Sequence, residues 1–251
     1  MGSISIGLIV FGCVFGGSSL GMVLRRIVPR HHLDEESKDV VKLGMGLVGT
    51  MAALVLGLLL ASAKGSYDAQ NAELTQVSAN IVLLDRVLAH YGPETTEARQ
   101  MLRAAVARGL DRMWPRDRAP VTKMDPASSD NEPLYEKIQA LSPKDDVQRS
   151  LKSQAIQIGM SFGLTRWLMY EQHTASVSNS LIIVMIFWLT IVFISWGLFA
   201  PPNVTVITTF FVAALSVSGA IFLILEMYNP YGGLIRISSA PLQAALAHLG
   251  Q

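Results

Sequence analysis

Charged residues are scarce in this sequence: Asp, Glu, Lys and Arg make up 16% of its 251 residues, whereas soluble domains contain roughly 25%. The formal net charge is only +1, so the chain lacks the strong field that attracts nucleic acid. Cysteine is almost absent as well, because Cys13 is the single one. The sequence therefore excludes a disulfide framework and a cysteine-based metal site.

Signatures of catalysis are also missing. The sequence has no Gly-rich phosphate loop, no nucleophile elbow and no metal-ligand spacing. Its one histidine pair, His31-His32, stands beside Asp34, Glu35 and Glu36 in a short loop. A divalent-metal site is one interpretation of this cluster, and an interfacial polar loop is the more ordinary one. The sequence accordingly predicts no enzyme and no resident cofactor or metal.

Four long apolar stretches account for the shortage of charge. About 20 apolar residues cross the hydrocarbon core as a helix, and four stretches have about this length: Ile4 to Leu24, Leu43 to Ala63, Leu181 to Phe199 and Val204 to Leu225. No positive segment precedes the first, which favours a retained span over a cleaved signal peptide. A tight turn at Pro201-Pro202-Asn203 predicts that the last two form an antiparallel hairpin.

The region between the second and third stretches, residues 64–180, has ordinary polarity. Apolar residues recur there in steps of three and four, the a/d pattern of a helical seam. The seam consists of Leu74, Val77, Ile81, Leu84, Leu88 and Tyr91. Because only Gly65 interrupts the run before this seam, we expect one long helix from the second span to Gly92-Pro93.

Further helices are expected beyond this point. A helix over Pro93–Met113 is followed by a surface loop over 116–131 and a short helix near 132–141. Ser142 to Asp145 resembles a capping box, and it precedes the apolar helical stripe Val147, Leu151, Ala155, Ile158 and Phe162. The sequence thus predicts an all-α integral membrane protein with four transmembrane helices and a helical extramembrane stalk domain between the second and third. The expected boundaries are 1–63 for the first two spans, 64–180 for the stalk domain, 181–226 for the hairpin and 227–251 for a C-terminal tail.

The orientation in the membrane is predicted from the basic residues. The 25–42 loop contains five of them, namely Arg25, Arg26, Arg30, Lys38 and Lys42. Close to the membrane on the other side we find mainly Lys64, Arg166 and Arg236. Positive residues in short loops favour the cytoplasmic side. We therefore expect a multi-pass protein of the bacterial inner membrane with a cytoplasmic first loop and a periplasmic stalk.

The interiors of the spans contain no Asp, Glu, His, Lys or Arg. Proton-coupled transporters usually need such groups at depth, whereas a passive pore does not. Small residues gather in the second span, and the pore-lining candidates are Gly46, Gly49, Thr50, Ala53 and Gly57. Close helix packing is the alternative explanation for this glycine content, as it is for the small-xxx-small pairs Gly12/Gly16 and Gly17/Gly21 of the first span.

A second group of candidates lies outside the spans or at their ends. Asp85, Arg86 and Arg99 border the seam, where ion pairs would tie helices together, and ligand binding is the alternative. Glu226 stands at the end of the fourth span. These four residues are structural or gating candidates.

Several short motifs occur together along the chain. They are Gly57-Leu58-Leu59, Tyr67-Asp68, Leu84-Asp85-Arg86, Tyr91-Gly92-Pro93, Arg99, Trp114-Pro115, Leu141-Ser142-Pro143, Phe187-Trp188-Leu189, Gly197-Leu198-Phe199-Ala200-Pro201, Glu226 with Pro230, and Ser238-Ser239 before Pro241-Leu242. In these motifs the chain resembles the bestrophin-like family of bacterial and plant membrane proteins over nearly its whole length. The resemblance implies kinship with bestrophins, which are anion channels assembled as rings with four spans per subunit.

The resemblance also has consequences that differ from the residue-based expectations. Bestrophins carry their helical insert in the cytosol, against the charge count above. The acidic calcium-binding cluster and the aromatic pore neck of animal bestrophins have no counterpart here, since Asp34-Glu35-Glu36 and Asp145-Asp146 are too short. Calcium gating is therefore not predicted.

Three functions remain open from the sequence. The first is a passive homo-oligomeric channel, conducting inorganic anions through a pore lined by the second span. The second is a membrane-anchored scaffold or sensor whose stalk binds a partner, without transport. An enzyme acting on lipid or peptidoglycan is the third, and no residue supports it.

Overall fold

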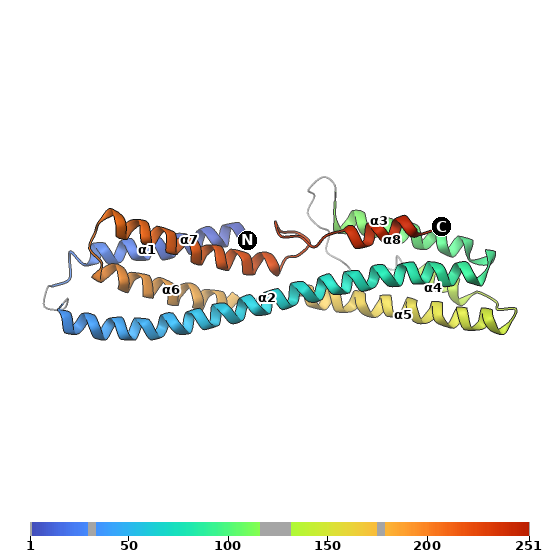
Figure 1. Cartoon of the computed structure of the whole chain (residues 1–251), viewed down its shortest axis with the longest axis horizontal. Helices are drawn as coiled ribbons and strands as arrows, with labels where there is room; N and C mark the ends of the chain where they lie inside the picture. The colour runs from blue at the N-terminus through green and yellow to red at the C-terminus, as the bar shows by residue number, and fades with distance from the viewer. Residues whose placement is uncertain (1, 30–33, 116–131, 175–178, 251) are drawn as a thin grey trace. The chain divides into compact units, whose positions relative to one another are not determined.

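A computed structural model of the chain describes residues 2–29, 34–115, 132–174 and 179–250. In order, the helices are α1 (Ser3–Leu24), α2 (Glu35–Tyr91), η2 (Pro93–Thr95), α3 (Thr96–Met113), α4 (Glu132–Gln139), α5 (Asp146–Thr174), α6 (Asn179–Phe199), α7 (Val204–Met227) and α8 (Ala240–His248) (Figure 1). No strand occurs in the described ranges, so the predicted all-α class is confirmed. His31-His32 and the predicted loop 116–131 lie outside these ranges.

Four of these helices, α1, α2, α6 and α7, are long and apolar enough to cross a membrane. They contain the four predicted apolar stretches. The second stretch and the seam belong to one continuous helix of 57 residues, α2, as expected from the lack of a breaker between them. The helical content and these four helices support the prediction of a membrane protein.

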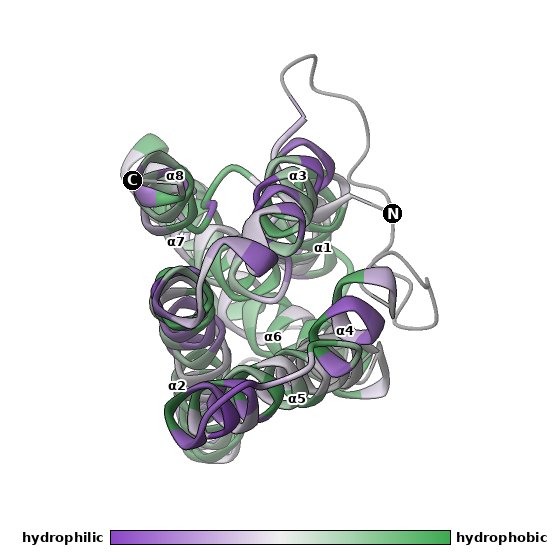
Figure 2. Ribbon diagram, turned by 90° about the vertical axis from the view of Figure 1, so that its right-hand side faces the viewer, coloured by the Kyte–Doolittle hydropathy of each residue, from purple (hydrophilic) through white to green (hydrophobic). Residues whose placement is uncertain are grey.

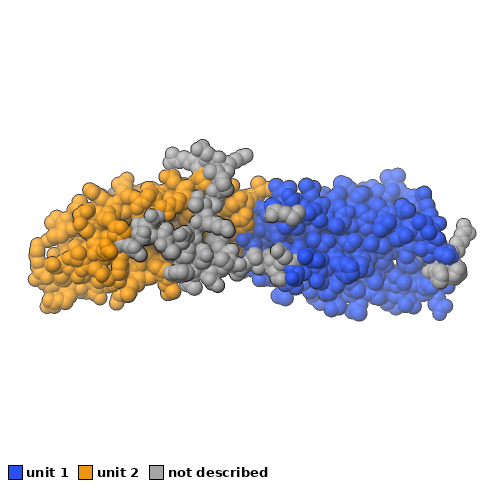
Figure 3. Space-filling model, turned by 180° about the vertical axis from the view of Figure 1, so that it is seen from behind, with its two compact units in different colours: residues 1–66, 176–228 blue, residues 67–175, 229–251 orange. Residues whose placement is uncertain are grey.

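The chain divides into two compact units (Figure 3). Unit 1 comprises residues 1–66 and 176–228, and unit 2 comprises residues 67–175 and 229–251. Unit 1 contains the four apolar stretches. Unit 2 contains the seam, α3 to α5 and the C-terminal segment, so each unit has its own core.

In unit 1, α1 packs against both α6 and α7. The backbones of α1 and α6 touch: a Cβ added at Gly21 would overlap the carbonyl oxygen of Ile194, and one added at Gly197 would overlap that of Ser18. On the side of α7, the buried Ser218 hydroxyl donates a hydrogen bond of 2.6 Å to the carbonyl of Gly7. Glycine allows this close approach because it has no side chain.

The turn between α6 and α7 is short, as predicted from Pro201-Pro202-Asn203. Asn203 caps α7, since its side-chain oxygen accepts a hydrogen bond of 2.8 Å from the backbone of Val206. Arg25 donates to the carbonyl of Ala200 at 2.7 Å and ties the end of α1 to the turn. Helices α6 and α7 also touch through the rings of Phe193 and Phe210.

The core of unit 2 forms around the seam of α2. Ile81, Leu84 and Leu88 are buried there with residues of four other helices: Ala98, Leu102 and Val106 of α3, Leu134 and Ile138 of α4, Ala155 of α5, and Leu242 and Ala245 of α8. The seam was expected to pack against the helix that leads to the third span, which is α5. The structure adds three further helices to this interface. Both hydrophilic and hydrophobic residues occur on α3 and α4 (Figure 2), as expected for partly buried helices.

Two details define the ends of helices in unit 2. Gly92 has φ +133°, a conformation that favours glycine, and it turns the chain from α2 into η2. The capping box predicted at Ser142 is wrong, because α5 begins only at Asp146. Asp145 caps it instead: its carboxylate accepts a hydrogen bond of 2.7 Å from the backbone of Gln148.

Candidate functional site

The second span is the part of unit 1 with the least protein around it. In its most apolar part 6% of the residues are buried, against 33% in α1 and 28% in each of α6 and α7. One narrow face joins the unit 1 core, through the buried Ala52 and the partly buried Val55, Leu56 and Leu59. Most of the remaining surface of this span is exposed.

The outward surface of this span separates into two stripes. Since an α-helix turns about 100° per residue, Gly46, Thr50, Ala53 and Gly57 fall on one side, which we name the small-residue stripe. Leu47, Met51, Leu54 and Leu58 fall beside it and form the large apolar stripe. All eight residues are exposed. A Cβ added at Gly46 or Gly57 would meet nothing within 4 Å.

Of the five pore-lining candidates, Gly49 lies apart from the other four. A Cβ at Gly49 would come to 4.0 Å from Cγ1 of Val192 on α6. Gly49 therefore stands at the edge of the face that α2 turns toward the unit 1 core. The sequence could not separate it from Gly46, because both are glycines within the same apolar run.

Thr50 carries the only polar side chain of the small-residue stripe. Its hydroxyl donates a hydrogen bond of 2.9 Å to the carbonyl of Gly46, one turn earlier in the helix. This bond satisfies the hydroxyl proton within the helix. The oxygen keeps its lone pairs on the outward surface.

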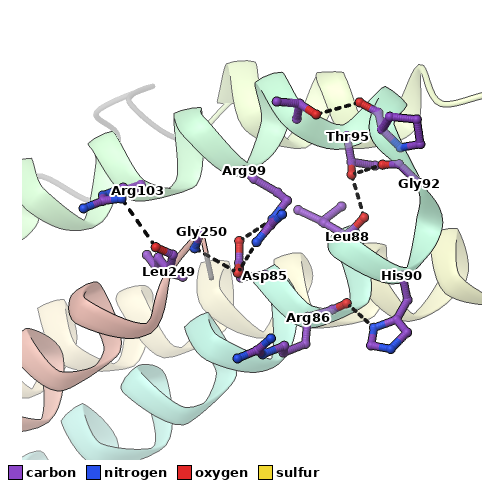
Figure 4. Close-up of polar contacts among 12 residues, drawn as sticks. Asp85, Arg86, Leu88, His90, Gly92, Thr95, Arg99, Arg103, Leu249 and Gly250 are labelled. Carbon is purple, nitrogen blue, oxygen red and sulfur yellow. Dashed lines mark hydrogen bonds and ion pairs between the residues drawn. The ribbon is translucent and has the colours of Figure 1, made fainter.

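Unit 2 contains a buried ion pair between two of the sequence candidates. The Asp85 side chain is 1% exposed and that of Arg99 23%. Nε of Arg99 donates to Oδ1 of Asp85 at 2.7 Å, and an Nη donates to Oδ2 at 2.9 Å (Figure 4). This two-bond geometry joins α2 to α3 and is the strong form of an arginine–carboxylate pair.

The C-terminal segment closes over this pair. The backbone N–H of Gly250 donates to Oδ2 of Asp85 at 3.3 Å, and Arg103 donates to the carbonyl of Leu249 at 3.5 Å. Leu249 is buried in the unit 2 core. The sequence predicted only a tail here, because α8 is short and its partners lie about 150 residues earlier in the chain.

Burial and hydrogen bonding act in opposite directions on Asp85. Burial raises the pKa of its carboxyl, but the hydrogen bonds from Arg99 and Gly250 lower it more, so the pKa lies below its ordinary value. The hydrogen bond to Asp85 raises the pKa of Arg99. Both groups are therefore ionised at neutral pH.

The other two candidates, Arg86 and Glu226, belong to different units. Arg86 is exposed on α2, and its carbonyl is in hydrogen-bond contact with Nδ1 of His90 at 2.8 Å. Its charge contributes to lowering the pKa of Asp85. Glu226 belongs to unit 1, where it is buried in the last turn of α7. Of the four candidates, the structure joins Asp85 and Arg99 by hydrogen bonds.

The described ranges contain no group of three or more His, Cys, Asp or Glu residues that could hold a metal ion. A small cavity in unit 1 is lined by apolar side chains of α2, α6 and α7, including Leu56, Met185 and Ile221. It offers no side-chain donor or acceptor to a polar ligand. Among the described residues, the small-residue stripe and the Asp85–Arg99 pair are therefore the candidate functional features.

Comparisons with known proteins place these features in a family. The family model of the bestrophin-like domain matches residues 12–242, nearly the whole chain. Searches of curated proteins and of solved structures return no significant match. The match includes the second span, the seam and the Asp85–Arg99 pair. The chain therefore belongs to the bestrophin-like family.

Proposed function

We propose that this protein is a passive ion channel, in which copies of the chain assemble around their second spans and the small-residue stripe lines the pore. The observation that carries the proposal is the outward position of Gly46, Thr50, Ala53 and Gly57 on the least buried span. Small side chains leave room for ions near the helix backbone. The family match supports a channel as the class of protein.

The walls of the proposed pore are almost neutral. The span interior has no charged residue, and Thr50 supplies the single hydroxyl of the stripe. Such a wall suits passive conduction, whereas active transport usually needs titratable groups at depth. Inorganic anions are the proposed ions, because the bestrophins that the family name invokes conduct anions.

A scaffold or sensor is the second candidate, in which the stalk seam would bind a partner, although a seam is expected in a channel as well. Ile81, Leu84 and Leu88 are buried within unit 2 of the same chain. The seam is therefore not available to a partner. We assign the Asp85–Arg99 pair to the stability of this unit, while Arg86 and Glu226 are kept as candidates for a role in gating.

Replacing Ala53 with Phe tests the pore. The expected effect is steric: a ring of added aromatic side chains narrows the path and excludes water. We expect anion flux through purified protein in liposomes to fall strongly, with the oligomer size in detergent unchanged. Gly49 is unsuitable for this test, because a large side chain there would collide with α6.

The matched control is Leu54→Phe. Leu54 is the next residue and belongs to the large apolar stripe, 70% exposed, so we expect its replacement to leave flux near the unmutated level. Equal loss of flux in both variants would show that the small-residue stripe does not line the path. An unmutated protein that carries no ions at any potential would remove the channel proposal in favour of the scaffold.

We further propose that unit 2 lies on the periplasmic side, as the basic residues of the 25–42 loop favour. Ser150 on α5 is exposed and lies outside the spans. In a Cys13→Ser background, Ser150→Cys is expected to react with a membrane-impermeant thiol reagent in intact cells. Reaction only after lysis would place unit 2 in the cytosol, as kinship with bestrophins implies.

A further inference from the structure

The chain that follows α7 folds into a small closed loop in unit 2. The N–H of Ile237 donates to the carbonyl of Pro230 at 2.9 Å, which ties the two ends of the loop together. The N–H groups of Gly232 and Gly233 donate to the carbonyl of Asn229 at 3.3 and 3.1 Å. We name residues 230–237 the exit loop. Its backbone conformation is fixed by these bonds.

The base of the exit loop is buried and its tip is not. Pro230, Tyr231 and Ile237 are buried. The indole N–H of Trp114 donates to the carbonyl of Ile237 at 3.0 Å, and its ring packs edge-on against Tyr231. The side chain of Leu234, by contrast, is 74% exposed. A rigid base therefore presents a large apolar residue to the surroundings.

Chain connectivity keeps the exit loop near the end of the membrane spans. Pro230 follows Met227, the last residue of α7, by three residues, which span at most about 10 Å. The hydroxyl of Tyr67 donates to the carbonyl of Arg236 at 3.4 Å. Tyr67 lies on the continuous helix α2, four residues beyond Ala63, which is about 6 Å of helix rise past the end of the second apolar stretch.

Arg236 adds a charge beside the apolar tip. It is exposed, and its Nε donates to the carbonyl of Gly233 at 2.8 Å, which holds the guanidinium on the loop. A guanidinium has five N–H donors and matches the oxygens of a phosphate. An apolar side chain next to a cation is the composition of segments that lie in the membrane interface.

From this arrangement we infer that the exit loop contacts the bilayer surface, with Leu234 inserted among the lipid headgroups and Arg236 bound to a phospholipid phosphate. The contact adds an anchor outside the four spans. It is independent of conduction, because none of its residues belongs to the small-residue stripe. The alternative is that a protein partner binds over Leu234, and the experiment below distinguishes contact with the bilayer from contact with a protein.

The test uses the full chain in phospholipid vesicles, with Cys13→Ser and a bimane fluorophore on Leu234→Cys. We expect lipids that carry a nitroxide on the headgroup to quench this fluorophore. The matched control is the same label on Val147→Cys. Val147 is also apolar and exposed, at 68%. The next residue, Gln148, is hydrogen-bonded to the carbonyl of Tyr91, and Tyr91 lies about 40 Å of helix rise beyond Lys64 along α2. We therefore expect no quenching of a label at position 147.

Each alternative outcome overturns the inference. Quenching at position 234 by aqueous iodide alone, as expected for position 147, would show that the loop points into water. Protection from both quenchers would show that protein covers it. For the phosphate contact, Arg236→Gln is expected to reduce headgroup quenching at position 234 and Arg236→Lys to retain it. Unchanged quenching in Arg236→Gln would remove Arg236 from the contact.

Discussion

Leu84→Asp is expected to abolish the folded state of unit 2. Leu84 is 1% exposed at the centre of the seam, where α3, α4, α5 and α8 surround it. Removing a buried leucine side chain costs about 2–5 kcal/mol, and a carboxylate at the same place has no partner, which adds a further penalty. Since domains are stable by only about 5–15 kcal/mol, we expect loss of soluble, monodisperse protein after detergent extraction.

The neighbouring residue provides the control for this change. Leu83 lies on the same helix and is 51% exposed, so Leu83→Asp places the same charge in contact with solvent. We expect its thermal unfolding to stay close to that of the unmutated protein. If Leu84→Asp unfolded at the same temperature as Leu83→Asp, the seam would have to be accessible to water, contrary to the described core.

Arg99→Met is expected to have the second largest effect. It removes both side-chain donors from the buried carboxylate of Asp85 and leaves an uncompensated charge, a change that costs about 3–5 kcal/mol in other proteins. The control is Arg103→Met, one turn further along α3, where Arg103 is exposed and makes a single long contact with Leu249. We expect the melting temperature to fall markedly in Arg99→Met and only slightly in the control.

The pH dependence of this variant gives an independent measurement. In the unmutated protein the pKa of Asp85 is lowered, so its contribution to stability is present above the unfolded-state pKa and is lost as pH falls through the folded-state value. Without Arg99, burial is opposed only by the hydrogen bond from Gly250 and the charge of Arg86, so we expect the pKa of Asp85 to rise relative to the unmutated protein. The variant should then gain stability relative to the unmutated protein as the pH is lowered. Parallel stability–pH curves would show that Arg99 does not hold Asp85 ionised.

Local sequence patterns were sufficient for the four long apolar helices and for the buried face of α2, but not for α8. Runs without charge predicted the four apolar helices, and the three-and-four spacing predicted which face of α2 is buried at Leu74, Ile81, Leu84 and Leu88. The first pattern depends only on the length of an apolar run, and the second depends only on the helix period. Neither requires knowledge of the tertiary structure. The start of α5 was missed because Ser142 and Asp145 both carry plausible capping oxygens, and only the fold selects one.

Tertiary placement could not be predicted in the same way. The pairs Gly12/Gly16 and Gly17/Gly21 have identical spacing, yet a Cβ at Gly12 or Gly16 would meet nothing within 4 Å, whereas Gly21 is in contact with the α6 backbone. The spacing is compatible with close packing, but it does not indicate which helix is the partner. Distant segments are likewise joined where Gly250 contacts Asp85 and where Leu249 contacts Arg103. A single sequence contains no pattern that indicates such contacts.

The backbone contact between α1 and α6 limits how unit 1 can move. Helices separated by side chains can slide past one another through small rotamer changes, which is the basis of shear motion. At Gly21 and Gly197 no side chain lies between the backbones to adjust in this way. The second span meets the other helices through side chains such as Leu56 and Leu59. We therefore expect α1 and α6 to behave as a rigid body, and α2 to be an element that shifts against it.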